Sequence, residues 1–206
     1  MVDPTRLVAS ARRAWGAAAD SLWGSILPVP RDRLVALSGG ESLPLKDGEL
    51  RVINTPGHAR HHLAFFDEPS RSLLTGDAAG VHLPGTDRVR PALPPPDLDL
   101  EALLASVDRM KELNPARLLY THFGPRLDGV QALQEYPPLV NRWREVALAA
   151  AREEPSVDHV AEALRHSEEQ LGGSESPAEV RVDLISGTTL AAQGLLRYFR
   201  TRGLIP

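Results

Sequence analysis

The stretch Asn54-Thr55-Pro56-Gly57-His58-Ala59-Arg60-His61-His62 follows the run Leu50-Arg51-Val52-Ile53 and precedes the apolar run Leu63-Ala64-Phe65-Phe66. An alternating run that ends in Thr-Pro-Gly is typical of a strand that stops at a turn. The reason is that proline lacks a backbone donor and glycine adopts backbone angles closed to other residues. The pattern therefore predicts that His58 lies at the end of a strand.

Two later hydrophobic runs end in the same way, in Leu73-Leu74-Thr75-Gly76-Asp77 and in Leu118-Leu119-Tyr120-Thr121-His122. Taken singly, a histidine or an aspartate beside glycine is more typical of a solvated turn. Three such residues, each directly after a strand, favour convergence at one edge of a sheet. Imidazole and carboxylate are ligands that bind Zn²⁺, Fe²⁺ or Mn²⁺ without cysteine, which this chain lacks. His58, Asp77 and His122 are therefore candidates for one metal site.

The composition is that of a soluble globular protein. Of the 206 residues, 42% are hydrophobic and 24% are charged, which suits one large domain or a domain with an appendage. No apolar run approaches the roughly 20 residues that span a bilayer, and the start lacks the pattern of a secretory signal. We therefore expect a cytoplasmic protein with no membrane partner. The net charge of −4 provides no basic field and argues against nucleic acid as a partner.

The pattern along the chain changes from helical to strand-like and back. Asp3 and Pro4 suit the start of a helix, which Gly16 and Gly24 divide into two short ones. Short strands are then expected near residues 34–37, 41–45, 49–54, 62–67 and 72–75, mostly antiparallel because tight turns join them. The proline-rich segment 81–97 is expected to be an irregular loop that forms a lid or a pocket wall.

The second half of the chain is expected to be mostly helical. Asp99 is predicted to cap a helix that ends at Asn114-Pro115, before a strand at 117–120 that delivers His122. Further helices are expected to start at Pro137-Pro138 and at Glu154-Pro155, and a last helix is expected from Leu184 to Phe199. These patterns predict a sheet-containing domain over 1–126 and a helical region over 127–206.

The motifs Thr55-Pro56-Gly57-His58, Thr75-Gly76-Asp77 and Thr121-His122-Phe123-Gly124 occur in an order and at a spacing that resemble the metallo-β-lactamase superfamily. The similarity is to its glyoxalase-II-like hydrolases in particular. The resemblance implies an α/β (α+β) fold, the αββα sandwich, which is built from two similar halves. By the same resemblance His58 binds a first metal, His122 binds a second, and Asp77 bridges both. His62 falls where the family often has a further histidine near the site, behind the ligands.

One part of the family pattern is absent. The signature HxHxDH supplies four more ligands N-terminal to these motifs, and no histidine precedes His58. The chain thus resembles the C-terminal half of the fold with its helical tail. Either it is a truncated or mis-started form of a longer enzyme, or it is a natural half-protein that needs a partner. Each metal position keeps two protein ligands, so we expect weak metal binding and little hydrolysis by this chain alone.

The function that the resemblance implies is metal-dependent hydrolysis of an ester, thioester or lactam/lactone-type bond in a small molecule. Zinc is the expected metal, in a two-metal site, with iron or manganese as alternatives. His82, Arg88 and Arg90, on the segment after Asp77, are weaker candidates for substrate contact. The alternative is a non-catalytic half-domain. Its open sheet face would associate with itself or with a partner chain, so we expect a homo-oligomer or a missing N-terminal half.

Overall fold

The structure is a computed structural model of the chain, and it describes all residues except 17, 18, 84, 87, 123 and 171–186. The chain divides into two compact units, Met1–Leu37 and Ser38–Pro206. No helix among the described residues combines the length and the apolar character needed to cross a membrane.

The first unit contains the two predicted short helices, α1 (Thr5–Trp15) and α2 (Ala19–Trp23), and a 3-10 turn at Arg31–Arg33. The Asp3 carboxylate accepts a hydrogen bond from the Thr5 backbone at 3.0 Å. Gly16 ends α1 with a φ of 56°, a conformation that glycine adopts readily. The strand expected near residues 34–37 is wrong, because these residues form no strand and the Val35 side chain is 78% exposed. A short apolar run becomes a strand only where another strand pairs with it.

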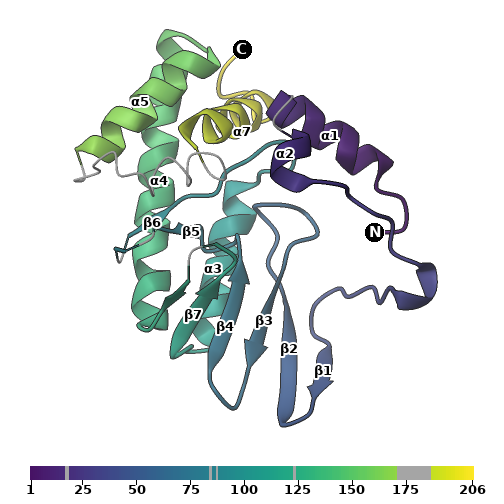
Figure 1. The fold of residues 1–206 in the computed structure, drawn as a ribbon. Helices are drawn as coiled ribbons and strands as arrows, with labels where there is room; N and C mark the ends of the chain where they lie inside the picture. Colours follow the sequence, from purple (N-terminus) through teal and green to yellow (C-terminus); the bar gives the residue numbers. More distant parts are fainter. Residues whose placement is uncertain (17–18, 84, 87, 123, 171–186) are drawn as a thin grey trace. The chain divides into compact units, whose positions relative to one another are not determined.

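The second unit is organised on a mixed sheet (Figure 1). Among the residues that the structure describes, six strands pair in the order β1-β2-β3-β4-β7-β8. Neighbours from β1 to β4 are antiparallel, β4 and β7 are parallel, and β8 is antiparallel to β7. The strands are β1 (Ser42–Leu45), β2 (Gly48–Asn54), β3 (Leu63–Asp67), β4 (Ser72–Gly76), β7 (Arg117–Tyr120) and β8 (Pro125–Arg126). The predicted antiparallel series is confirmed, and β8 was not predicted.

The two faces of the sheet differ in what packs against them. Ala64, Phe66 and Leu73 are almost fully buried and belong to the main core with residues of α3 and α4. Strand partners point to the same face, so the register places Phe65, Leu74 and Leu119 together on the opposite face. Leu74 there is 36% exposed. The sheet thus has one face in the main core and a second apolar face outside it.

Helix α3 (Leu100–Glu112) is the crossover between β4 and β7, and it begins where the sequence predicted. The Asp99 side chain accepts a hydrogen bond from the Ala102 backbone at 3.0 Å, as an N-cap does. The parallel pairing of β4 and β7 follows from this crossover, because only a long connection can return a strand to the same direction.

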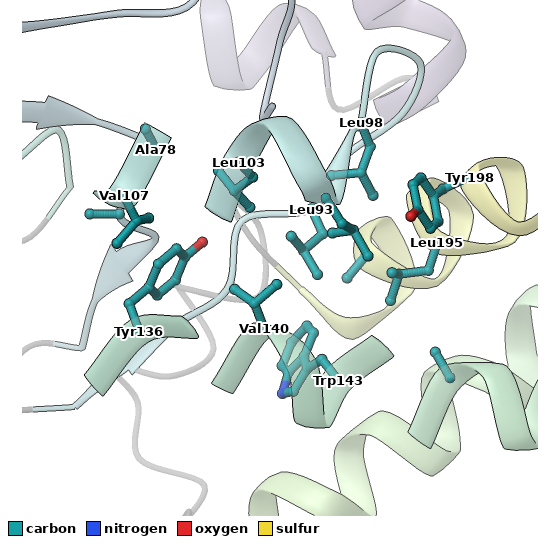
Figure 2. Close-up of a cluster of buried hydrophobic side chains, with 14 of the residues drawn as sticks. Ala78, Leu93, Leu98, Leu103, Val107, Tyr136, Val140, Trp143, Leu195 and Tyr198 are labelled. Atoms are coloured by element: carbon teal, nitrogen blue, oxygen red, sulfur yellow. The ribbon is translucent and has the colours of Figure 1, made fainter. Parts of the chain in front are cut away.

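Helix α4 (Gly129–Glu153) begins eight residues before the predicted start at Pro137-Pro138. Both prolines lie inside the helix, where each removes one backbone hydrogen bond at a cost of about 3 kcal/mol. Tyr136, Val140 and Trp143 on the same turns are buried in the core (Figure 2), and their burial offsets that loss. Tertiary packing therefore outweighs the local helix-breaking signal.

The helices beyond residue 127 share the core of the sheet. Buried residues of α4, α5 (Val157–Glu169) and α7 (Thr188–Thr201) lie in one cluster with Leu73 and Leu118 of the strands. Figure 2 shows Trp143 and Leu195 within this cluster. The expected beginning of the last helix near Leu184 lies outside the described residues. A boundary between 126 and 127 stays a prediction.

The described residues of segment 81–97 are not wholly irregular, contrary to the prediction of an irregular loop. It contains two short antiparallel strands, β5 (Val81–His82) and β6 (Val89–Arg90). The following residues Ala92 and Leu93 are buried. Val89 and Pro91 line one pocket, and Val81, Ala92 and Leu93 line another, so the prediction of a pocket wall is confirmed.

Candidate metal centre

The sheet topology brings the three predicted ligands to one edge. β2 and β4 each pair antiparallel with β3, so they run in the same direction, and β7 runs parallel to β4. His58, Asp77 and His122 each follow one of these three strands. All three residues therefore lie beyond the carboxyl ends of parallel-running strands.

The loop that carries His58 is pressed against helix α3. Ser106 donates a hydrogen bond to the Pro56 carbonyl at 2.7 Å, and the Asp99 backbone donates to the Gly57 carbonyl at 2.9 Å. Gly57 has a φ of 137°, and a Cβ there would lie 2.3 Å from Leu103 Cα. Only glycine fits this contact, so the Thr-Pro-Gly turn fixes where His58 can be.

Asp77 lies between the two imidazoles. His58 Nε2 is 3.5 Å from Asp77 Oδ2, and His122 Nε2 is 3.6 Å from Asp77 Oδ1. The three side chains are about a quarter exposed or less, at 18%, 27% and 24% for His58, Asp77 and His122. Each carboxylate oxygen therefore faces a different histidine.

One oxygen of the Asp77 carboxylate is buried without a hydrogen-bond donor among the described residues. Oδ1 is buried and has no hydrogen-bond partner within the described part of the chain. A buried carboxylate oxygen without a donor is costly, and a cation is the usual alternative partner. Two ligands held at about 2.1 Å on a tetrahedral ion are about 3.4 Å apart, close to both measured separations. The donor set and its spacing fit a divalent metal.

The arrangement offers two pairs of ligands rather than one triad. The part of the chain that the structure describes contains no group of three histidine, aspartate or glutamate side chains placed to hold a single ion. His58 with Asp77 Oδ2 is one pair, and His122 with Asp77 Oδ1 is the other. Metal binding by these two pairs stays a prediction.

The hydrogen bond of the His58 ring decides which nitrogen is free. His58 Nδ1 lies 3.0 Å from the Ala92 carbonyl oxygen, and a carbonyl only accepts, so Nδ1 carries the proton. In the neutral ring the lone pair is on Nε2, which faces Asp77. A carbonyl behind a histidine is the usual way to fix the tautomer of a metal ligand.

His62 is behind the ligands and holds two of their loops together. Its Nε2 accepts a hydrogen bond from the Asp77 backbone at 3.0 Å, so its Nδ1 is protonated and donates to Thr55 Oγ1 at 2.7 Å. Burial, followed by the nearby His58, lowers the pKa of His62 to about 4. With both nitrogens engaged and the ring neutral, His62 is unsuited to bind metal in this arrangement.

Gly76 makes room for this histidine. Its φ is 54°, and a Cβ there would lie 2.4 Å from His62 Nε2. The Thr-Gly-Asp motif therefore serves geometry as well as ligation: glycine admits the His62 ring, and the next residue supplies the carboxylate.

The weaker candidates lie apart from these ligands. His82 is 8% exposed, bonds the Thr86 carbonyl at 2.7 Å and stacks on Tyr120. Arg90 is 7% exposed and pairs with Glu168 at 2.8 Å, while Arg88 lines a separate groove. None of the three is among the lining residues of the small cavity beside His58 and Asp77. Their contact with substrate stays a prediction.

Sequence reasoning missed part of the surroundings. A cavity of about 30 Å³ adjoins His58 and Asp77, and Leu190 and Ala191 of α7 help to line it. Thr55 could have been suspected, since it is part of the Thr-Pro-Gly-His motif. No local signal marks Ala92 or Leu190, because the tertiary fold alone brings Ala92 to His58 and Leu190 to the cavity beside it.

The fold and the site define a mixed α/β protein with histidine and carboxylate ligands at one sheet edge. The sequence model of the metallo-beta-lactamase superfamily matches residues 3–122, which is more than half of the chain. The chain belongs to the metallo-beta-lactamase superfamily, whose members generally bind metal ions. The family and the mixed α/β fold expected from the sequence are thereby confirmed.

Relatives of known sequence or structure agree. The chain is 34% identical over 96 residues to the metallo-beta-lactamase fold-containing protein ST1585 of Sulfurisphaera tokodaii, covering 47% of this chain and 35% of that protein. It is 32% identical over 119 residues to the lactamase-like protein adaB of Aspergillus niger, covering 57% and 34%. The solved structure of ST1585 has a TM-score of 0.57 at 29% identity, over 65% of this chain and 50% of that chain.

A solved metallo-beta-lactamase family protein of Thermus thermophilus, TTHA1429, shares the fold over 97% of this chain and 60% of its own, with a TM-score of 0.53. The matched regions thus span about a third of the curated relatives and 50–60% of these two solved structures. The activity and substrates of the full-length relatives are therefore not assigned to this chain by similarity.

Proposed function

We propose that this chain carries part of the active site of a metal-dependent hydrolase that cleaves an ester, thioester or lactam/lactone-type bond in a small molecule. The observation that supports it best is the Asp77 carboxylate, whose oxygens each face a different imidazole and one of which is buried without a donor. Membership of the superfamily supports a hydrolase but does not specify the bond that is cleaved.

In this proposal His58 and Asp77 hold one divalent ion, and His122 and Asp77 hold another. Zinc is the first choice, with iron or manganese as alternatives, because imidazole and carboxylate suit all three. Bound zinc would supply Lewis-acid chemistry, which would activate a water for attack at neutral pH and polarise the carbonyl under attack.

The residues of the chain do the positioning. The Ala92 carbonyl accepts a hydrogen bond from His58 Nδ1 and so leaves Nε2 directed at Asp77, and His62 holds the Asp77 backbone in place. Leu190 and Ala191 form an apolar side of the cavity beside His58. An apolar wall restricts water at the site and so strengthens the electrostatic interactions within it.

The test is hydrolysis by metal-loaded protein, assayed on p-nitrophenyl esters, S-acyl thioesters and lactones. We expect weak activity that depends on added zinc, iron or manganese and is lost in Asp77→Asn. The matched control is Asp108→Asn, which removes an exposed carboxylate that pairs with Lys111. Equal activity in Asp77→Asn and Asp108→Asn would contradict the proposal.

A second candidate is a non-catalytic half-domain that associates through its open sheet face. The observation that favours it is the apolar set Phe65, Leu74 and Leu119 on the face opposite the main core. Such a face is an association site when it is large and stays uncovered. A half-domain of this kind would self-associate or bind a partner chain. It would show no metal-dependent hydrolysis.

A further inference from the structure

A groove of about 450 Å³ lies between β6, β8, α4 and α5, and none of its lining residues lines the small cavity at the metal centre. Its volume is within the range of small-molecule sites. Most of its wall is apolar, supplied by Val89, Pro91, Ala132, Leu139 and Trp143.

The charged groups of this groove, which include Arg88, each take part in an interaction within the chain. Arg126, whose side chain is 4% exposed, pairs with Asp128 and with Glu135, the latter at 2.9 Å. Glu168, 12% exposed, pairs with Arg90 at 2.8 Å. An ionised ligand would be desolvated here without gaining an opposite charge of its own, which is unfavourable. The groove therefore suits a neutral, apolar group.

The groove adjoins the segments that follow Asp77 and His122, and through Pro91 it adjoins the segment that bonds His58. Pro91 lines it and precedes Ala92, whose carbonyl accepts the His58 hydrogen bond. Tyr136 lines it and packs on the segment after Asp77, where a Cβ at Gly80 would lie 2.7 Å from the tyrosine ring. Arg126 lies four residues after His122. A molecule seated in the groove is thus next to the walls of the metal centre.

We infer that this groove binds the neutral apolar part of the substrate, a short alkyl or aryl group. That the group belongs to the substrate rests on the proposed hydrolase function, whereas binding of such a group does not. The substrate class is accordingly an ester or thioester with an apolar acyl or alcohol moiety rather than a charged one.

Binding can be measured on the metal-free chain. In a Trp15→Phe, Trp23→Phe background, Trp143 is the one tryptophan left, and its fluorescence reports on the groove wall. Titration with 1-alkanols from butanol to octanol should give saturable binding that tightens about threefold to fourfold per added CH₂. Alkanoates and alkylamines of equal length should bind at least tenfold more weakly.

Two variants on α4 localise the effect. Leu139→Gln places an amide in the groove and should weaken octanol at least tenfold, and Leu139 is not among the residues packed on the main core. Val130→Gln, at a half-buried position outside the groove, should leave the affinity unchanged. Absence of saturable binding, equal binding of the charged analogues, or equal weakening by both variants would overturn the inference.

A second series separates the groove from the hydrolase function. In metal-loaded protein, KM for p-nitrophenyl alkanoates should fall with chain length as the alkanol dissociation constants do, and Leu139→Gln should raise it. A flat KM series beside length-dependent alkanol binding would overturn the assignment to substrate. Failure to hydrolyse any ester would count against the proposed function. The alkanol titrations show independently whether the groove binds a neutral apolar group.

Discussion

At the scale of single residues, two histidines beside Asp77, His58 and His62, have different roles in the centre. His58 has one nitrogen engaged with the Ala92 carbonyl and the other facing Asp77, whereas His62 has both engaged in hydrogen bonds. The same residue type therefore supplies a candidate ligand at one position and a structural tie at the other. The difference comes from hydrogen-bond partners, which the sequence does not show.

Replacement of His62 by leucine should destabilise the chain. The partly buried Asp77 backbone N–H would lose its acceptor, at a cost of about 1–3 kcal/mol in the free energy of unfolding. The neighbouring exposed residue supplies the control: His61→Leu should stay within about 0.5 kcal/mol of the parent. Urea unfolding of the metal-free proteins measures both, and similar losses in the two variants would contradict the role given to His62.

The lowered pKa of His62 also predicts a pH dependence. An unfolded histidine binds a proton near pH 6.5, while folded His62 does so only near pH 4, because burial disfavours its charged form. Between these values the unfolded state binds more protons, so stability rises with pH and is complete above about 6.5.

After allowance for solvent screening, the titration of His62 changes the free energy of unfolding by about 2 kcal/mol at most over this pH range. Unfolding free energies of the metal-free chain from pH 4 to 7 should show this slope, and His62→Leu should flatten it. A slope that is unchanged in the variant would assign the pH dependence to other groups.

At the scale of elements, the close approach of the His58 loop to α3 sets the centre. Gly57→Ala would place a Cβ 2.3 Å from Leu103 Cα at a φ of 137°. Such a clash with backbone forces a shift of the loop, and we expect a loss of about 3 kcal/mol or more, with weaker metal binding.

Gly40→Ala is the matched control. It has a comparable φ of 94° but nothing within 4 Å of the added Cβ, so it carries the backbone strain without the contact. The difference between the two melting temperatures isolates the packing against α3. Equal shifts would show that the contact with Leu103 contributes nothing.

Local patterns predicted most elements but not all of them. The Asp99 cap and the strand-turn motifs at His58 and Asp77 are local signals, and the structure has the elements where these signals predict them. Pro137-Pro138 gave a false helix start because burial of Tyr136 and Trp143 offsets the lost hydrogen bonds. The contacts of Ala92 and Leu190 at the centre could not be predicted, since they connect positions far apart in the chain.

At the scale of the whole molecule, the second apolar face of the sheet predicts self-association. A few hundred Å² of apolar surface contribute several kcal/mol when buried between two copies, at about 25 cal/mol per Å². Light scattering of the purified chain should therefore show a mass above 22.4 kDa.

Leu74→Glu, on this face, should shift the mass toward the monomer. Leu127→Glu, at a position that is 77% exposed between β8 and α4, should not. A parent chain that is monomeric with a cooperative melt would contradict the expected association.

The most direct test of the central claim is a zinc titration of the metal-free chain by calorimetry. If Asp77 bridges two positions with two protein ligands each, the chain takes up two weakly held ions. His58→Ala and His122→Ala should then each remove one ion, and Asp77→Asn should remove both. One tightly held ion, with an affinity that Asp77→Asn leaves unchanged, would contradict the account.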